Sequence, residues 1–179
     1  MTKQASDIFL YEDFEYDLLD YDGKGLINPR DFGMEPEFVE TDCYAGFISN
    51  YEITKDGLFL TEMQIANTIN KYSTIQGIKP KPLGERSSYV VYQQLRLFTP
   101  YTGIIQAGRR YTEREKELCK LLHRSIKEYK EVTEFTFDEG MPTYGKSTRD
   151  DGLVSSFDFF DSIDQEFEYL KNSTKLLER

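Results

Sequence analysis

The sequence predicts one α+β domain over residues 1–179, with a mostly antiparallel β-sheet and two packed α-helices at about 112–131 and 162–177. Three observations lead to this prediction. Aromatic-rich runs are separated by tight turns, two segments carry apolar residues at helical spacing, and 13 Tyr with 13 Phe supply large core side chains. Burial of this aromatic surface can offset the chain entropy that folding removes.

The first strands are predicted from alternation of apolar and acidic residues. In residues 14–19, Phe14, Tyr16 and Leu18 alternate with acids, which is the two-residue period of a half-buried strand. Together with residues 8–11 they form an N-terminal hairpin. A helix over the same residues is the alternative, because apolar residues there also fall at helical spacing.

The best-defined strand pair is a hairpin over residues 43–63, whose turn is Lys55-Asp56-Gly57. Gly57 can adopt a positive φ at little cost, and Asp56 suits a turn position. Further strands are expected at 89–98, 101–106 and 132–137. The segments between them are predicted loops, at 20–42 and as an exposed Pro/Gly-containing loop at about 66–88.

The helices are predicted from caps and apolar stripes. Thr112 and Glu115 form a capping box, and an apolar stripe follows, from which we expect burial of Leu118, Leu122 and Ile126 against the sheet. The second helix carries a stripe of Ile163, Phe167, Leu170 and Leu177.

The charge is distributed unevenly along the chain. Of the net charge of −10, residues 1–63 contribute −11, residues 64–131 contribute +7 and residues 132–179 contribute −6. One interpretation is internal pairing of the basic middle with the acidic flanks. The other is an acidic face that steers a basic protein partner, with the following candidate residues: Asp13, Asp17, Asp20 and Asp22.

Composition also argues against several classes of protein. The acidic balance disfavours nucleic acid as a ligand, and no apolar run reaches the roughly 18–20 residues of a membrane span. The start of the chain has no apolar leader pattern, so we expect a soluble cytoplasmic protein. Cys43 and Cys119 are expected to be small buried hydrophobic residues in a reducing compartment, with a regulatory or metal-bound pair as the alternative.

Residues with catalytic or metal-binding patterns are few. Cys119 and His123 provide two metal ligands at best, and acids such as Asp161 and Asp164 near a helix start favour the helix dipole without any function. We therefore expect no cofactor, no metal site and no catalytic residues. A hydrolase or transferase with a carboxylate and tyrosine site is the enzymatic alternative.

Residues 20–31 resemble the twelve-residue calcium loop of helix-loop-helix proteins, with acids at positions 1, 3 and 12 and Gly at position 6. Lys24 places a cation at position 5, and Pro29 disrupts the start of the helix that would follow. An acidic, turn-rich loop is the preferred interpretation, and a calcium-binding module is the alternative.

A resemblance adds to these patterns. Cys43-Tyr44-Ala45-Gly46-Phe47, Tyr51-Glu52-Ile53 and Asp56-Gly57-Leu58-Phe59-Leu60 resemble the hairpin signature of a family of uncharacterised bacterial proteins. That signature has Trp where Tyr44 and Tyr51 stand, and Arg where Ala45 stands. The resemblance implies a bacterial protein of similar fold and no established activity. In size and acidity the chain is similar to immunity proteins, so the leading expectation is a non-enzymatic protein-binding domain of the immunity, or toxin-neutralising, type.

Overall fold

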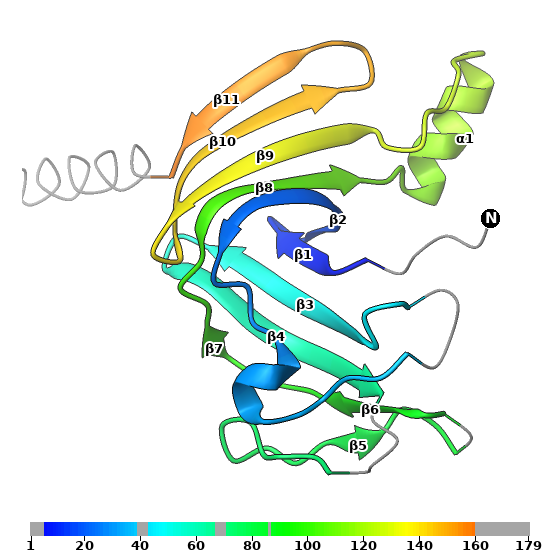
Figure 1. Ribbon diagram of the computed structural model, residues 1–179. Helices are drawn as coiled ribbons and strands as arrows, with labels where there is room; N and C mark the ends of the chain where they lie inside the picture. Colours follow the sequence, from blue (N-terminus) through cyan, green and yellow to red (C-terminus); the bar gives the residue numbers. More distant parts are fainter. Residues whose placement is uncertain (1–5, 39–42, 67–70, 86, 160–179) are drawn as a thin grey trace, which may run out of the picture.

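The computed structural model describes residues 6–38, 43–66, 71–85 and 87–159 (Figure 1). Within them, one sheet of eleven strands is accompanied by one α-helix and one short 3-10 helix, η1. The elements in chain order are β1 (Ile8–Tyr11), β2 (Phe14–Lys24), η1 (Pro29–Phe32), β3 (Phe47–Thr54), β4 (Gly57–Ala66), β5 (Lys81–Pro82), β6 (Tyr89–Tyr92), β7 (Leu97–Phe98), β8 (Thr102–Arg109), α1 (Glu113–Leu121), β9 (Glu131–Asp138), β10 (Met141–Arg149) and β11 (Val154–Asp158).

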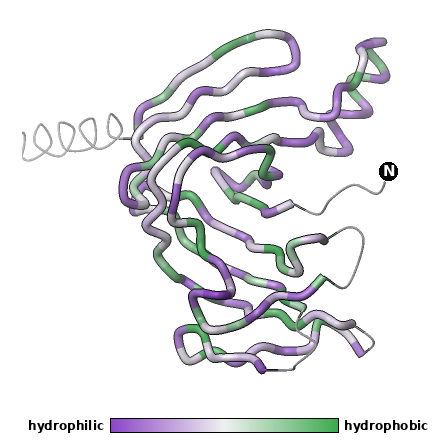
Figure 2. Tube along the Cα trace, viewed as in Figure 1, coloured by the Kyte–Doolittle hydropathy of each residue, from purple (hydrophilic) through white to green (hydrophobic). Residues whose placement is uncertain are grey.

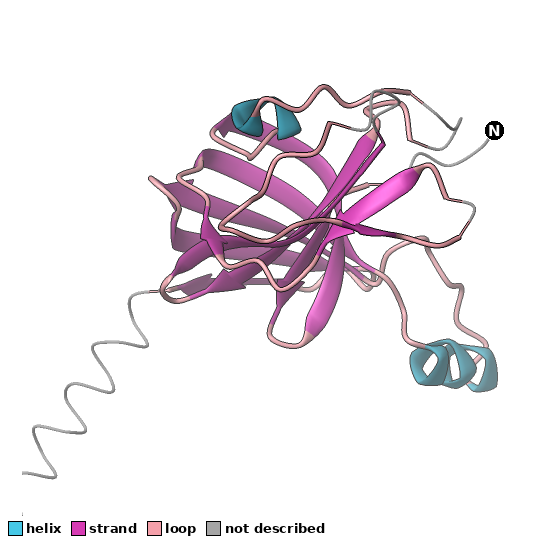
Figure 3. Cartoon of the chain, turned by 90° about the horizontal axis from the view of Figure 1, so that it is seen from below, coloured by secondary structure: helices cyan, strands magenta, loops and turns pink. Residues whose placement is uncertain are grey.

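The sheet is mostly antiparallel, as predicted. Its strand order is β11-β10-β9-β8-β2-β1-β3-β4-β6-β5, and β7 pairs with β4. Only β1 and β3 run parallel among these described strands, and they join a half that ends at β11 to a half that ends at β5. Figure 1 shows the two halves above and below this junction, and Figure 3 shows the strands curling around the interior.

The turn between β9 and β10 ties the two halves together. Leu58 at the start of β4 donates its amide hydrogen to Gly140 O at 2.8 Å, and the Gly140 amide donates to Tyr101 O at 2.7 Å. Gly140 has a φ of 85°, and a Cβ there would lie 2.5 Å from the carbonyl oxygen of Thr99. The turn therefore requires glycine for both its conformation and its close approach.

The core fills the concave side of the curled sheet with aromatic and aliphatic side chains. Phe9 of β1 and Tyr51 of β3 stack with ring centroids 5.1 Å apart, across the parallel junction. The largest fully buried side chains are Tyr51, Tyr92, Tyr101, Phe9, Phe135, Phe137, Met34, Leu58, Leu60, Met63, Ile65 and Ile75. They come from both halves and form one main cluster, and Cys43, Ala66 and Tyr89 form a small second cluster.

The predicted α+β class with two packed helices is wrong, because the structure is mostly β-sheet. The helix expected over 112–131 spans only Glu113–Leu121 and has no buried residue. Leu118, Leu122 and Ile126, expected in the core, are 55%, 54% and 41% exposed. The predicted helix at 162–177 lies outside the described residues.

The physical reason for the short helix is a break after its second turn. His123 adopts a φ of 52°, and its amide hydrogen bonds to Lys120 O at 3.1 Å, which turns the chain away from the helix axis. The residues of the apolar stripe that follow this turn are therefore not part of the helix. Figure 2 shows hydrophobic and hydrophilic residues alternating along the α1 segment, which projects from the sheet.

Several strands are longer, shorter or additional compared with the prediction. Both hairpins form, but β2 continues to Lys24 and occupies residues assigned to a loop. The single strand predicted over 89–98 is divided into β6 and β7, because Gln94 has a φ of 60°. The structure adds β10 and β11, which were not predicted.

The predicted loop at 66–88 has some regular structure in its described part. Ile75 and Ile78 form an isolated bridge, Ile75 is buried, and Lys81–Pro82 pairs with β6 while remaining exposed. Among the described residues, no helix has the length and apolar character needed to cross a bilayer.

Candidate functional site

A β-bulge in β2 places three aspartates on one face of the sheet. Leu18 pairs with Ala107 and Asp20 pairs with Gln106, so Leu19 is an extra residue without a partner in β8. Side chains alternate along a strand, and an extra residue reverses the alternation beyond it. Asp17, Asp20 and Asp22 therefore all lie on the outer face, opposite the buried Ala107.

Asp17 is held by one arginine and one tyrosine. Its Oδ2 accepts a hydrogen bond from Arg110 Nε at 2.6 Å and one from Tyr129 Oη at 3.2 Å. The Tyr129 ring covers Gly108, where a Cβ would lie 2.6 Å from the ring. Asp17 is thus part of an internal contact between the acidic first segment and the basic middle of the chain.

Asp20 and Asp22 have a different environment. They border a shallow hollow of about 150 Å³ on the outer face, together with Tyr21, Ile104, Gln106 and Glu134. Gln106 Nε2 lies 3.5 Å from Glu134 Oε1. Among the described residues, neither aspartate nor Glu134 forms an ion pair. Three carboxylates are therefore grouped and available on one face.

Asp13 lies apart from this group. It occupies the turn between β1 and β2 with a φ of 64°, and it is exposed. It lines a second hollow, of about 350 Å³, with Arg109, Arg110 and Asp17 among the other lining residues. The structure thus separates the four predicted aspartates into a pair beside Glu134 and a pair beside arginines.

The segment that resembles a calcium loop is divided between two elements. Residues 20–24 are the end of β2, and Asp31 lies in η1, where its Oδ2 accepts a hydrogen bond from the Asn28 amide at 2.8 Å. Asn28 Oδ1 in turn accepts from the Arg30 amide at 3.0 Å. These residues cap a 3-10 turn, a conformation different from a compact calcium loop.

Helix α1 is attached to the sheet by charge. Its capping box forms as predicted, with Glu115 Oε2 accepting from the Thr112 amide at 2.9 Å. The same carboxylate accepts from Lys130 Nζ and lies 3.5 Å from Arg109 Nη1. Burial opposes ionisation of Glu115, but these three partners outweigh it and lower its pKa to about 2. The helix therefore docks through one glutamate.

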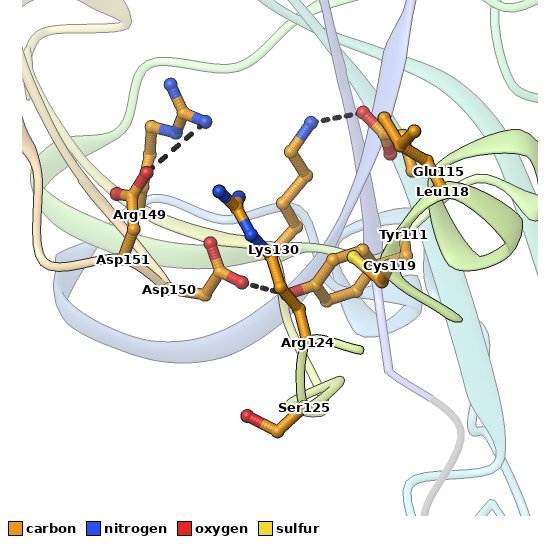
Figure 4. A pocket seen from close by; sticks show the side chains of 10 residues that line it. All are labelled: Tyr111, Glu115, Leu118, Cys119, Arg124, Ser125, Lys130, Arg149, Asp150 and Asp151. Carbon is orange, nitrogen blue, oxygen red and sulfur yellow. Dashed lines mark hydrogen bonds and ion pairs between the residues drawn. The ribbon is translucent and has the colours of Figure 1, made fainter. Parts of the chain in front are cut away.

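A further hollow lies beside this helix (Figure 4). It has a volume of about 500 Å³, within the range of small-molecule pockets. Its wall combines α1, the segment that follows it, and the ends of β9 and β10. The lining residues are Tyr111, Glu115, Leu118, Cys119, Arg124, Ser125, Lys130, Arg149, Asp150 and Asp151.

Tyr111 and Asp150 form a hydrogen-bonded pair in this pocket. Burial, followed by the hydrogen bond and charge of Asp150, raises the pKa of Tyr111 to about 12. The hydrogen bond from Tyr111 lowers the pKa of Asp150. The two pKa values move away from neutrality in opposite directions, so the pair favours structural or binding roles over proton transfer at pH 7.

Cys43, Cys119 and His123 occupy three different environments. Cys43 is buried and donates its thiol hydrogen to Phe47 O, with Sγ 3.4 Å from that oxygen. Cys119 is partly buried and lines the pocket beside α1. His123 is exposed in the turn after the helix.

Sequence reasoning missed Glu134 and the pocket. The alternation in Val132-Thr133-Glu134-Phe135-Thr136-Phe137 does place Glu134 on the face opposite Phe135. The sequence does not indicate the strand order, which brings Glu134 near Asp20. The pocket depends on the end of α1 at Leu121. The helical spacing of apolar residues continues past this point, so the sequence did not indicate it.

Comparisons with family models, curated proteins and solved structures found no match to this chain. The resemblance at residues 43–60 accordingly stays an interpretation of the sequence.

Proposed function

We propose that this chain is a non-enzymatic protein-binding domain that presents the outer face around Asp20, Asp22 and Glu134 to a basic protein. The observation that carries the proposal is the bulge at Leu19, which places both aspartates on the face of Glu134. If Leu19 were paired regularly with a residue of β8, Asp20 and Asp22 would face the other side of the sheet from Asp17.

The surroundings of these carboxylates support a binding role. Ile104 beside them is 44% exposed, which adds apolar contact area to the charged group. Protein interfaces combine such apolar area with charges that steer the encounter. A toxin-neutralising role, suggested by the likeness to immunity proteins, would be one form of this function and would use the same face.

Asp17 is assigned a different role from that predicted. Its contacts with Arg110 and Tyr129 hold the segment after α1 against the sheet. It shapes the face without offering a free charge. Asp13 lies beyond it, next to Arg109 and Arg110 in the second hollow, and is not part of the proposed contact surface.

The test is a measurement of association rate after charge reversal. The full chain is used to capture binding proteins from cells of its own source, and each captured protein is then purified. For a basic partner, D20K/D22K should slow association by roughly tenfold or more at low salt. The difference should shrink as the Debye length falls to about 8–10 Å.

The matched control is E85K/E117K, which changes the net charge equally at exposed sites outside the proposed face. The control should bind at nearly the wild-type rate. Equal slowing by both double variants would show a net-charge effect and refute the assigned face. Binding that is unchanged in D20K/D22K would refute it as well.

A further inference from the structure

The pocket beside α1 is lined by cations from three separate parts of the chain. Arg124 comes from the segment after α1, Lys130 precedes β9, and Arg149 ends β10. Figure 4 shows the three side chains extending into the same region, with the Arg124 guanidinium between the other two in this view. This convergence is independent of the acidic face described above.

The cations have donors that their protein partners do not use. Among the described residues, the Arg124 side chain has no ion pair or hydrogen bond, and Arg149 Nη2 lies 3.5 Å from Asp151 Oδ2. Lys130 gives one of its three hydrogens to Glu115. A guanidinium carries five N–H donors and an ammonium three, so most of the donors facing the pocket remain available.

The carboxylates of the pocket are engaged. Glu115 is shared by Lys130, Arg109 and the Thr112 amide. Asp150 Oδ2 accepts from Tyr111, and Asp151 Oδ1 accepts from the Leu153 amide at 3.1 Å.

Two more cations support the wall from outside the lining. Arg109 pairs with Glu115, and Lys127 donates from Nζ to the Asp150 backbone oxygen at 2.7 Å. The lining has three cations and three acids, and these two additional cations contact two of the acidic residues, Glu115 and Asp150.

The rest of the wall has a mixed character. Leu118 and Cys119 contribute apolar surface from α1, the ring of Tyr111 lies next to them, and Ser125 contributes a hydroxyl group. A volume of about 500 Å³ exceeds what a phosphate ion alone would fill. The pocket therefore suits a ligand with an anionic end and a small apolar body.

We propose that this pocket binds a small organic phosphate, with its phosphoryl oxygens between Arg124, Lys130 and Arg149 and its apolar body against Leu118 and Cys119. A phosphoryl group offers three acceptor oxygens, and arginine forks match phosphate geometry with paired hydrogen bonds. Three donors approaching from three elements provide one partner for each oxygen. A carboxylate, with two oxygens in one plane, would leave one cation without a partner.

The experiment uses the full chain and three probes: phenyl phosphate, inorganic phosphate and phenol. Binding is measured by calorimetry, and its place is read from the backbone amide resonances of residues 119–125. Phenyl phosphate should bind saturably with a dissociation constant below roughly 10 mM, more tightly than inorganic phosphate, and phenol should not bind. Arg124→Ala and Arg149→Ala should each weaken phenyl phosphate binding by roughly tenfold.

Arg114→Ala is the matched control, because Arg114 is an exposed arginine of α1 outside the pocket lining. It should leave binding unchanged, and Arg124→Lys should fall between wild type and Arg124→Ala. Equal weakening by Arg114→Ala, or phenyl phosphate and inorganic phosphate binding alike without any response to Arg124→Ala, would reduce the site to an adventitious ion only and overturn the proposal. Absence of saturable phenyl phosphate binding would also overturn it.

Discussion

Arg110 Nε donates a hydrogen bond to Asp17 Oδ2 at 2.6 Å, and the Arg110 guanidinium also lies 5.5 Å from the centre of the Tyr129 ring. This pair joins a strand from the acidic first third of the chain to the end of β8 in its basic middle. Internal charge pairing and a free acidic group therefore coexist on one strand, with the bulge at Leu19 between them.

The first prediction follows from that division. Asp17→Asn should lower the free energy of unfolding by about 1 kcal/mol, because it removes the charge from hydrogen bonds with Arg110 and Tyr129. Asp20→Asn and Asp22→Asn should each stay within about 0.5 kcal/mol of wild type. Urea denaturation measures all three. A loss from Asp20→Asn as large as that from Asp17→Asn would contradict the assignment of Asp20 as unpaired.

The second prediction concerns Gly145 of β10, which lies under the ring of Phe157. A Cβ at position 145 would lie 2.1 Å from Phe157 Cζ, and that ring also stacks on Tyr11 at 5.8 Å. Gly145→Ala should therefore cost about 1–3 kcal/mol by overpacking. The measurement is the urea midpoint. Gly84→Ala is the control, since no atom lies within 4 Å of its added Cβ, and it should be neutral or slightly stabilising.

Local patterns predicted most strands but not the architecture. The turn at Asp56-Gly57 and the alternation of Phe14, Tyr16 and Leu18 are local signals, and both hairpins formed. In β10, glycine, proline and polar residues interrupt the alternation of apolar and polar residues. Gly145, for example, leaves room for the ring of Phe157 in the neighbouring strand β11. When the residue type at one position is determined by a side chain of another strand, the segment itself shows no periodic pattern.

The candidate site was predictable to a similar extent. Clustering in the sequence identified Asp20 and Asp22 correctly as neighbours, but Asp17 joined Arg110, which lies 93 residues away. The bulge that decides which face each aspartate occupies comes from the pairing of β2 with β8. Long-range pairing of this kind cannot be read from one strand.

The third prediction tests the polar attachment of α1. Glu115→Gln should destabilise the protein by about 1–2 kcal/mol at pH 7, because the buried Arg109 and the partly buried Lys130 lose their carboxylate. The pKa of Glu115 is lowered in the folded state, so its stabilisation is present above about pH 4.5 and is lost as the pH falls towards 2. Denaturation curves of the two proteins should therefore converge in acid, and a constant difference would contradict this role.

A fourth prediction replaces the original expectation for Leu122. As a core residue it would cost about 2–5 kcal/mol on mutation to alanine. Leu122 is 54% exposed at the end of α1, so Leu122→Ala should change the free energy of unfolding by no more than about 0.5 kcal/mol. Leu60→Ala, in a fully buried position of β4, is the comparison and should show the large loss. Similar urea midpoints for the two variants would argue against the exposed position of the helix.

The last prediction concerns Asp7, which precedes β1. Its Oδ1 accepts a hydrogen bond from the Ser49 amide at 2.8 Å. Burial raises the pKa of Asp7 to about 6, although the Ser49 amide acts in the opposite direction. Between about pH 4 and 6 the folded state thus binds more protons than the unfolded state, and stability contributed by this group falls as the pH rises through that range.

Asp7→Asn should remove this penalty, because an asparagine oxygen can still accept from Ser49 and carries no charge to bury. The variant should be more stable than wild type at pH 7 by about 1–3 kcal/mol, and the advantage should disappear near pH 4. Urea denaturation from pH 4 to 8 measures the difference, with Asp56→Asn in an exposed turn as the control for loss of one negative charge. A variant less stable than wild type at pH 7 would show instead that the Asp7 carboxylate stabilises the fold.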